Sequence, residues 1–409
     1  MNHNVIKTTD LTEFFSIKQD GNYLLLEPKK TATNIVIYDP GLAHTAICKS
    51  NLIRINNQNG MLYYRDIPLE ELLEKDFIDI AAKIIFECNK KKIRFKIAVH
   101  TYFQLIPEVK NIIDILPPST NPMDILGIAT IALGSIENKY LKDLSSKDEK
   151  AGFLVGQIGV IVAYLYTKIH NIPWVESQNN LSFAEKILFQ MHGGKNLNRL
   201  QKIAELFNSI LILHAEHGQT CSTAAVRTVA SARSTLYTSI SARIAAFNGP
   251  IHGGASQFVS AMYEEIIQNN LDVEEYVKNK LSNKQPIMGF GHRIYNRIGC
   301  WDSRALIMYK ILTNPSFEFS EIKEYTNIAL KLIEYTANND FFKKRNLAPN
   351  PDLFNCIFFK LFGAPKEMNT SMIVIARVVG WIANFMEHVQ DNLPITRPCE
   401  MNKAFNQFL

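Results

Sequence analysis

The sequence lacks the cysteine patterns that mark a disulfide framework or a zinc centre. Its six cysteines are spread over 409 residues, and no two of them form a C-x-x-C pair. In so large a chain this distribution indicates buried or free thiols rather than structural cross-links. The six are Cys48, Cys88, Cys221, Cys300, Cys356 and Cys399.

The sequence also contains no block of five like charges and no repeated or low-complexity tract. Such charge blocks are typical of nucleic-acid-binding arms, so we expect no nucleic-acid partner. The net charge is +5, charged residues make up 20% of the chain, and hydrophobic residues make up 47%. This composition predicts a folded protein with a large core and two or three domains, and excludes a disordered chain.

No targeting or membrane-spanning segment is evident. The stretch Met1–Phe15 has neither an apolar core nor an Arg-rich amphipathic pattern, so we expect a cytoplasmic protein. Two later stretches, Ala151–Thr167 and Met372–Ala383, are strongly apolar but shorter than the roughly 20 residues that cross a bilayer. We interpret both as buried helices of a protein that does not enter the membrane.

Strand patterns occur only near the start of the chain. Tyr23–Leu26, Asn34–Tyr38 and Leu52–Ile55 are short apolar runs bounded by Gly, Pro or Asn. The turn residues Asn57–Gly60, followed by Met61–Arg65, predict a hairpin. We therefore expect a small β segment at the N-terminus.

Helical spacing dominates the rest of the chain. Pro68 predicts the start of a helix through Leu72, and Asn121 before Pro122 predicts a capped helix start. Ser182–Glu185 has the pattern of a capping box. The fold is thus predicted to be mainly α. Further long helices are predicted over Leu197–Leu211, Ala215–Phe247, Ala255–Ile267, Ile322–Ala337 and Leu353–Phe362.

Two histidines lie in glycine-rich turns that precede helical patterns. His252 lies within Gly249–Ala255, and His292 lies within Met288–Arg293. Glycine lets a ligand approach the backbone closely, and the amides at a helix start attract anions. One such histidine taken alone is more often structural, whereas with two of them a structural role and a functional cleft are equally open.

A third histidine segment, Leu213–Gly218, raises the question of a metal site. His214 and His217 are separated by Ala215 and Glu216, which is not the H-E-x-x-H arrangement. No third ligand occurs at a suitable spacing, so we expect no metal.

Asp352 and Arg377 each leave two interpretations open. Asp352 follows two prolines at the start of an apolar helix, where spacing favours a helix cap over a catalytic base. Arg377 lies in the apolar stretch Met372–Ala383 and needs an anion, because an unpaired buried charge is costly. Either a protein carboxylate or a substrate carboxylate would suit its planar guanidinium.

Together these segments resemble the citrate synthase family, in the family's order and over nearly the whole chain. The resemblance implies a citrate synthase-like two-domain helical fold with a small N-terminal β segment. The matching segments are Tyr38–Gly41, Gly60–Arg65, Leu213–His217, Gly249–Ala255, Met288–Arg293, Pro349–Asp352, Ala376–Ala383 and Arg397–Pro398.

The resemblance also implies an activity, the condensation of acetyl-CoA with oxaloacetate and water to give citrate and CoA, without a further cofactor. Asp352 would remove a proton from the methyl group of acetyl-CoA. His252 would donate a hydrogen bond to the thioester oxygen, and His292 would polarise the carbonyl of oxaloacetate. Arg293 and Arg345 would lie near the phosphates of CoA.

Four further residues would hold the carboxylates of oxaloacetate. In the family the arginine that matches Arg397 comes from the partner subunit, so the resemblance implies an obligate homodimer. The N-terminal segment resembles that of a larger bacterial subtype that forms NADH-inhibited hexamers, so a hexamer is a second possibility. The four residues are His217, Arg304, Arg377 and Arg397.

The implied domains divide the site. Residues 1–50 would form the N-terminal β segment, residues 51–254 and 363–409 a large helical domain, and residues 255–362 a small helical domain. The site residues come from both helical domains, so they would meet when the domains close and exclude water.

This chain departs from the family's usual pattern at several positions. The interval between His292 and Arg304 is three residues longer than usual, which leaves Arg297 as an alternative to Arg304. Where the family usually has Gly-Tyr-Pro, this chain has the sequence Asp66–Pro68. Substrate preference and turnover therefore stay open. The remaining departures are Ser256 for Asn, Ser303 for Pro, and Asn355 and Cys356 for Ser-Gly.

Two other functions fit the same motifs. A 2-methylcitrate synthase would use propionyl-CoA in place of acetyl-CoA. A catalytically weak relative would bind CoA or dicarboxylates as a regulator, although it would have no need of a base such as Asp352.

Overall fold

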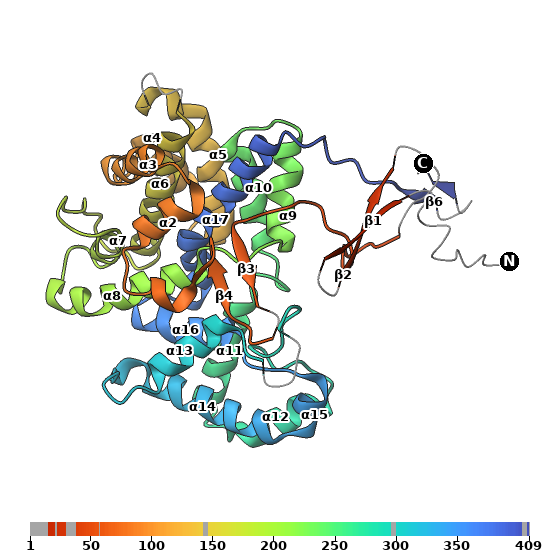
Figure 1. The fold of residues 1–409 in the computed structure, drawn as a ribbon. Coiled ribbons are helices and arrows are strands. Elements are labelled where there is room, and N and C mark those ends of the chain that lie inside the picture. The colour runs from red at the N-terminus through yellow and green to blue at the C-terminus, as the bar shows by residue number, and fades with distance from the viewer. Residues whose placement is uncertain are drawn as a thin grey trace. The chain divides into compact units, whose positions relative to one another are not determined.

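The computed structural model of the chain describes residues 15–20, 23–29, 38–56, 58–141, 146–295, 300–402 and 407–408. It divides into two units. The first comprises Met1–Lys49 and Arg397–Leu409, and the second comprises Ser50–Thr396. Figure 1 shows the elements of both.

The first unit contains two short antiparallel pairs. Strand β1 (Phe15–Asp20) pairs with β2 (Tyr23–Pro28), with Ile17 opposite Leu26. The predicted strand at the start of β2 is confirmed, whereas most of the one predicted over Asn34–Tyr38 lies outside the described residues. Strand β6 (Met401–Asn402) pairs with β7 (Gln407–Phe408), so the expectation that strands occur only near the start is wrong.

The second unit begins with a three-stranded antiparallel sheet. Its order is β3 (Ile53–Ile55), β4 (Leu62–Tyr64) and β5 (Ile67–Pro68), which confirms the predicted hairpin. The helix predicted at Pro68 is a single 3-10 turn, η1 (Leu69–Leu72), which buries Leu69 and Leu72.

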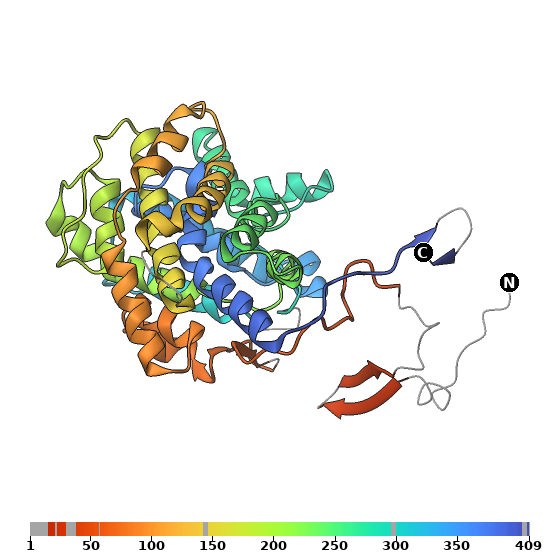
Figure 2. The same ribbon diagram turned by 90° about the horizontal axis from the view of Figure 1, so that it is seen from above.

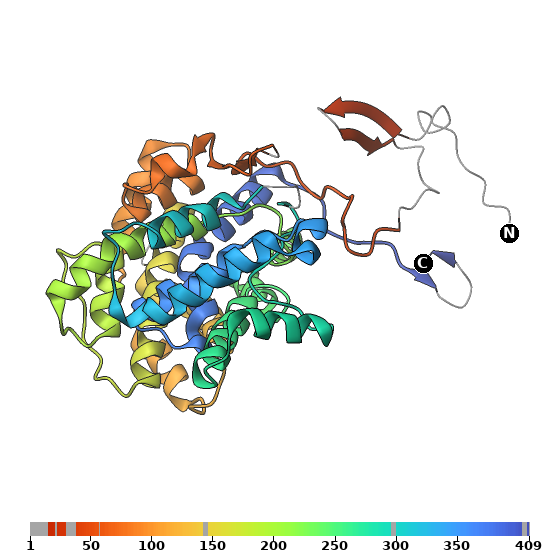
Figure 3. The same ribbon diagram turned by 90° about the horizontal axis from the view of Figure 1, so that it is seen from below.

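Helices make up nearly all of the remainder of this unit, so the fold is mainly α. In Figure 1, α11 to α16 lie together below α2–α10 and α17; Figures 2 and 3 show the same helices from above and below. The division into large and small domains at 254 and 362 stays a prediction. The helices of the first group are α2 (Phe77–Ile85), α3 (Asn89–Thr101), α4 (Pro107–Ile115), α5 (Pro122–Tyr140), α6 (Lys147–Ile169), α7 (Phe183–Met191), α8 (Leu197–His214), α9 (Cys221–Ser231), α10 (Leu236–Phe247) and α17 (Asn369–Asp391). Those of the second group are α11 (Ala255–Gln268), α12 (Val273–Ser282), α13 (Ser303–Leu312), α14 (Lys323–Asn338), α15 (Asp340–Arg345) and α16 (Pro351–Leu361), with the 3-10 turns η2 (Ser320–Ile322) and η3 (Lys366–Met368).

Among the described residues, two helical segments are long and apolar enough to cross a membrane, namely α6 and the run Lys366–Asp391 that contains α17. They have 23 and 26 residues, so the length argument against them was wrong. Their burial supports the interpretation as core helices, because 89% and 83% of their most apolar windows are buried inside the protein.

The continuous helix predicted over Ala215–Phe247 is wrong. The chain breaks after α8 and again between α9 and α10. Thr220 and Thr235 cap the two new helices, since their side chains accept hydrogen bonds from the backbone of Thr223 and Thr238. The first break places His217 in a turn rather than inside a helix.

Other predicted helix starts are confirmed. The side chain of Asn121 accepts from Met123 N at the start of α5, and Ser182 and Glu185 form the capping box of α7. The predicted bounds of α11 and α14 agree with the structure to within one residue.

Candidate active site

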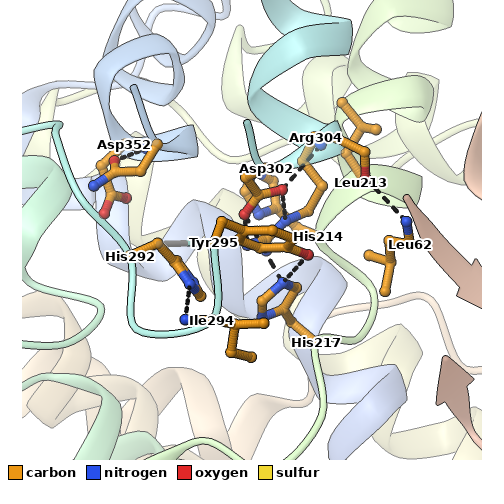
Figure 4. A network of polar contacts seen from close by, with 12 residues as sticks. Leu62, Leu213, His214, His217, His292, Ile294, Tyr295, Asp302, Arg304 and Asp352 are labelled. Carbon is orange, nitrogen blue, oxygen red and sulfur yellow. Dashed lines mark hydrogen bonds and ion pairs between the residues drawn. The ribbon is translucent and has the colours of Figure 1, made fainter. Parts of the chain in front are cut away.

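A cavity of about 130 Å³ lies within the second unit, where loops from both groups of helices meet. Most of the site residues predicted from the sequence line it, although the first and last of them, His217 and Arg377, are 160 positions apart in the chain. Figure 4 shows part of the cluster, with His292 and Asp352 beside the contacts of His217, Tyr295, Asp302 and Arg304. The predicted residues in the cavity wall are His217, His252, His292, Arg304, Asp352 and Arg377.

Asp352 is not the cap of its helix, so the interpretation that spacing favoured is wrong. The cap of α16 is Asn350, whose side chain accepts from Asp352 N at 3.0 Å, and Pro351 is the first helical residue. The carboxylate of Asp352 is therefore free to line the cavity. Burial raises its pKa to about 6, against the opposing effects of an Asn355 hydrogen bond and of Arg304 and Arg377. Such a carboxylate suits a general base near neutral pH.

His252 presents a defined tautomer to the cavity. Its Nε2 lies 2.7 Å from Ser222 Oγ and accepts a longer hydrogen bond, 3.4 Å, from Ser222 N. Because a backbone N–H can only donate, the proton of a neutral imidazole is on Nδ1. Burial lowers the pKa of His252 to about 4, with further contributions from Arg377 and Arg243, so the ring is neutral near pH 7.

His292 has the opposite tautomer. Its Nδ1 accepts from Ile294 N at 3.0 Å, so Nε2 carries the proton of the neutral ring. Burial lowers the pKa of this imidazole to about 4, with Arg304 contributing next. Both histidines are thus neutral hydrogen-bond donors rather than cations.

The loop that carries His292 is tied to the loop before Asp352. Gly291 N donates to Ala348 O at 2.8 Å, and Asn350 N donates to Gly289 O at 2.9 Å. Gly289 and Gly291 both have φ +86°, a conformation that side chains disfavour, which explains the glycines on either side of Phe290. These bonds bring His292 and Asp352 to the same wall of the cavity.

A buried charge pair forms the opposite side of the cluster. Asp302 caps α13 and accepts from Arg304 Nε at 3.0 Å and from the terminal Arg304 nitrogen at 2.6 Å. Burial acts to lower the pKa of Arg304, but Asp302 outweighs it and the pKa is raised. His217 Nε2 lies 2.9 Å from Tyr295 Oη, and burial lowers the pKa of His217 well below its usual range.

Arg377 is 6% exposed, lies on α17 and lines the cavity. Within the described residues no carboxylate forms an ion pair with it, and its Nε has no hydrogen-bond partner. Burial lowers its pKa to about 10, with Arg304 contributing next, which still leaves it charged at neutral pH. Of the two interpretations of this arginine, a bound carboxylate therefore fits better than a protein carboxylate.

A metal ion is the other chemistry to weigh here. His217, His292 and Asp302 offer ligand atoms within 4.8 Å of one another. Both oxygens of Asp302 already accept from Arg304, however, so a cation there would lie beside a guanidinium and be repelled. The donor set fits a hydrogen-bonded network better than a cation site, and the expectation of no metal stays a prediction.

Three predicted residues lie outside the cavity wall. Arg293 and Arg345 are exposed in the second unit, where the guanidinium of Arg345 lies 4.0 Å from the ring centroid of Phe341. Arg397 belongs to the first unit. Their roles stay predictions. Arg297, the alternative to Arg304, lies outside the described residues.

Sequence reasoning missed several residues that hold the site together. Ser222 contacts His252, Tyr295 contacts His217, and His214 contacts Asn355 at 2.7 Å. His214 and Asn355 were visible as a motif histidine and a departure from the family pattern, whereas no local pattern marked Ser222 or Tyr295.

Comparison with known proteins decides the family. Residues 41–399 match the family described as "Citrate synthase, C-terminal domain". The chain belongs to the citrate synthase family. It is 30% identical over 396 residues to citrate synthase 1 of Mycobacterium tuberculosis, covering 94% of this chain and 91% of that protein. It is 28% identical over 391 residues to the citrate synthase of Corynebacterium glutamicum, covering 92% and 88% of the two chains.

Solved structures agree with this membership. Citrate synthase from Thermotoga maritima is similar with a TM-score of 0.74 and 33% identity, covering 89% of this chain and 95% of that one. Citrate synthase from Thermoplasma acidophilum, solved as a ternary complex with carboxymethyl coenzyme A and oxaloacetate, has a TM-score of 0.78 and 27% identity, covering 88% and 94%. The mainly α citrate synthase fold is confirmed, and the chain is a transferase of the citrate synthase type.

Proposed function

We propose that this citrate synthase family member condenses acetyl-CoA with oxaloacetate and water to give citrate and CoA. One observation carries the proposal: a carboxylate whose pKa burial raises to about 6 shares a cavity with four imidazoles, whose pKa values burial lowers, and two guanidinium groups. The proposed reaction needs no cofactor, because acetyl-CoA takes part in it as a substrate.

The first step is removal of a methyl proton from acetyl-CoA by Asp352. A thioester methyl is a very weak acid, so the negative charge that develops on the thioester oxygen must be stabilised as the proton leaves. The Nδ1–H of His252 is available for this, because Ser222 occupies the other ring nitrogen. A fixed donor of this kind contributes about 3 kcal/mol in comparable sites.

The second step joins the enol carbon to the ketone carbon of oxaloacetate. The Nε2–H of His292 would polarise that ketone, while Arg304, Arg377 and His217 would hold the two carboxylates. Water then cleaves the thioester of the joined product and releases citrate and CoA. Arg397 from the partner subunit would complete the carboxylate site in a homodimer. We also propose a cytoplasmic location for the protein.

The direct test is CoA release measured with a thiol reagent. Wild-type protein should release CoA rapidly when acetyl-CoA and oxaloacetate are both present, and not when either is omitted. Propionyl-CoA is assayed in parallel, and a higher kcat/KM with it would assign the protein as a 2-methylcitrate synthase. Folded protein that binds oxaloacetate but releases no CoA from either thioester would instead be the regulatory relative.

The pH dependence of kcat should report the base. Below about pH 6, Asp352 is protonated and cannot accept the methyl proton, so kcat should fall with a single-proton acid limb centred near its pKa of about 6. His252 and His292, with pKa values of about 4, stay neutral through this range. The check is kcat measured on both sides of pH 6 at saturating substrates. A profile that stays flat down to about pH 4, the pKa of the two histidines, contradicts the assignment of Asp352 as the base.

A further inference from the structure

In the cavity wall, two polar side chains form a series of contacts that ends on Asp352. His214 Nε2 lies 2.7 Å from Asn355 Oδ1, and Asn355 Nδ2 lies 3.3 Å from Asp352 Oδ1. His214 is at the end of α8, while Asn355 is one turn after Asp352 on α16. His214 and Asn355 are 3% and 1% exposed.

The order of donors and acceptors in this series of side chains is determined by the groups at its two ends, the Asp352 carboxylate and the His214 ring. A carboxylate only accepts hydrogen bonds, so the amide nitrogen of Asn355 must face Asp352. The amide oxygen then faces His214, which must carry its proton on Nε2. Burial lowers the pKa of His214 well below its usual range, with Arg304 contributing next, which keeps the ring neutral. Rotating the Asn355 amide by half a turn would place its oxygen against the Oδ1 oxygen of Asp352, and two acceptors cannot form a hydrogen bond.

We propose that His214 and Asn355 act as positioning residues for the catalytic base, His214 orienting the amide of Asn355 and Asn355 holding one oxygen of Asp352. This inference rests on the proposed condensation and adds to it the residues that aim the base. Oδ1 of Asp352 is held, and among the described residues no hydrogen bond occupies Oδ2, which is left for the proton of the substrate.

The arrangement accounts for one departure from the family pattern. The family usually has serine where this chain has Asn355, and a serine side chain is too short to bridge between α8 and the carboxylate. Asparagine presents a donor and an acceptor at opposite faces of one planar group. The long 3.3 Å bond restrains the carboxylate while leaving it basic enough to act.

Other charges that face Asp352 must be kept unchanged in a test. Arg304 on α13 and Arg377 on α17 lower its pKa, and Asp302 before α13 raises it. The imidazoles of the cavity wall are neutral near pH 7, and burial raises the pKa of the neighbouring Cys356 thiol, so it is uncharged as well. Loss of the Asn355 donor should therefore appear as a change in the titration of Asp352 alone.

The test compares Asn355→Ala, Asn355→Ser and His214→Phe with wild type in kcat, KM and pH profile. Removing a residue that orients a metal ligand typically costs about tenfold to a hundredfold, and we expect an effect of the same order on a positioned carboxylate, so kcat should fall at least about tenfold in Asn355→Ala. The KM for oxaloacetate should stay within about twofold. The acid limb of kcat should move to higher pH in both Asn355→Ala and His214→Phe, and the double variant should be no worse than Asn355→Ala.

The matched control is Asn369→Ala. Asn369 is also 1% exposed and donates to Ser260 Oγ at 2.7 Å, but it does not line the cavity. The substitution of Asn369 should lower the melting temperature of the protein without moving the acid limb of kcat. An acid limb that is unchanged in both Asn355→Ala and His214→Phe overturns the proposal, as does equal movement in the control.

A second measurement separates this inference from the proposed reaction. The side-chain carboxyl carbon of Asp352 is titrated by NMR in protein labelled at aspartate, and its signal is assigned with Asp352→Asn. Its pKa should rise in Asn355→Ala and in Asn355→Ser, in which the bridge from α8 is also lost. If wild type releases no CoA from either thioester, the proposed function fails, and this titration still decides whether His214 and Asn355 hold the carboxylate.

Discussion

Replacing Asp352 with asparagine lowers kcat for CoA release by about 10³-fold, within the range that a positioned general base contributes. Asparagine has nearly the same size and shape as aspartate but cannot accept a proton from carbon. The cap of α16 is Asn350, so the helix keeps its hydrogen-bonded start in this variant. The expected result is loss of turnover with an unchanged fold, measured by CoA release, far-UV circular dichroism and oxaloacetate binding.

The control for this variant is Asp340→Asn, the same chemical change in the first turn of α15. The Asp340 side chain is 79% exposed and forms only a surface ion pair with Lys344, so its loss should leave turnover unchanged. If Asp352→Asn retains more than about a tenth of wild-type kcat, Asp352 does not act as the base.

Replacing Arg304 with methionine is expected to damage both stability and substrate binding. The side chains of Asp302 and Arg304 are 1% and 6% exposed and form a double hydrogen-bonded ion pair. Removing one partner leaves a buried charge uncompensated, which typically costs about 3–5 kcal/mol. Chemical denaturation should show this loss, and calorimetry should show much weaker oxaloacetate binding, because one of the two cavity guanidinium groups is gone.

The double variant Asp302→Asn/Arg304→Met separates the two effects. It removes the uncompensated charge, and asparagine can still cap α13, so most of the lost stability should return. Oxaloacetate binding should not return, because the guanidinium is still missing. Recovery of binding together with stability would show that Arg304 acts through the fold alone, and no stability loss in the single variant would contradict the account of the pair.

Sequence reasoning found the site where chemistry depends on short local motifs. The glycine turns around His252 and His292 were recognisable because clustered glycines leave a local pattern. The turn at His252 leads into α11 as predicted, whereas the helix expected directly after His292 is wrong, since α13 begins at Ser303. Residue spacing predicted Asp352 as the cap of its helix, whereas the cap is Asn350. Two prolines before a helix do not tell which of these two residues caps it.

The errors in the fold have a similar origin. The segment Ala215–Phe247 was predicted to be helical, yet the side chains of Thr220 and Thr235 cap the starts of two separate helices there. Apolar spacing reports which face of a segment is buried, and it does not by itself fix where one helix ends and the next begins. The break before Thr220 places His217 in the cavity wall.

By itself, the sequence determined the mainly α character, the order of the motifs and the identity of the groups able to do chemistry. These depend on periodicity and on residue type, which are local properties. Only the tertiary structure decided which nitrogen of His252 and of His292 carries the proton, that Asp302 pairs with Arg304 while no carboxylate among the described residues pairs with Arg377, and that Asn355 faces Asp352. Those features depend on contacts between segments far apart in the chain, and on the burial that shifts each pKa, neither of which has a fixed spacing in sequence.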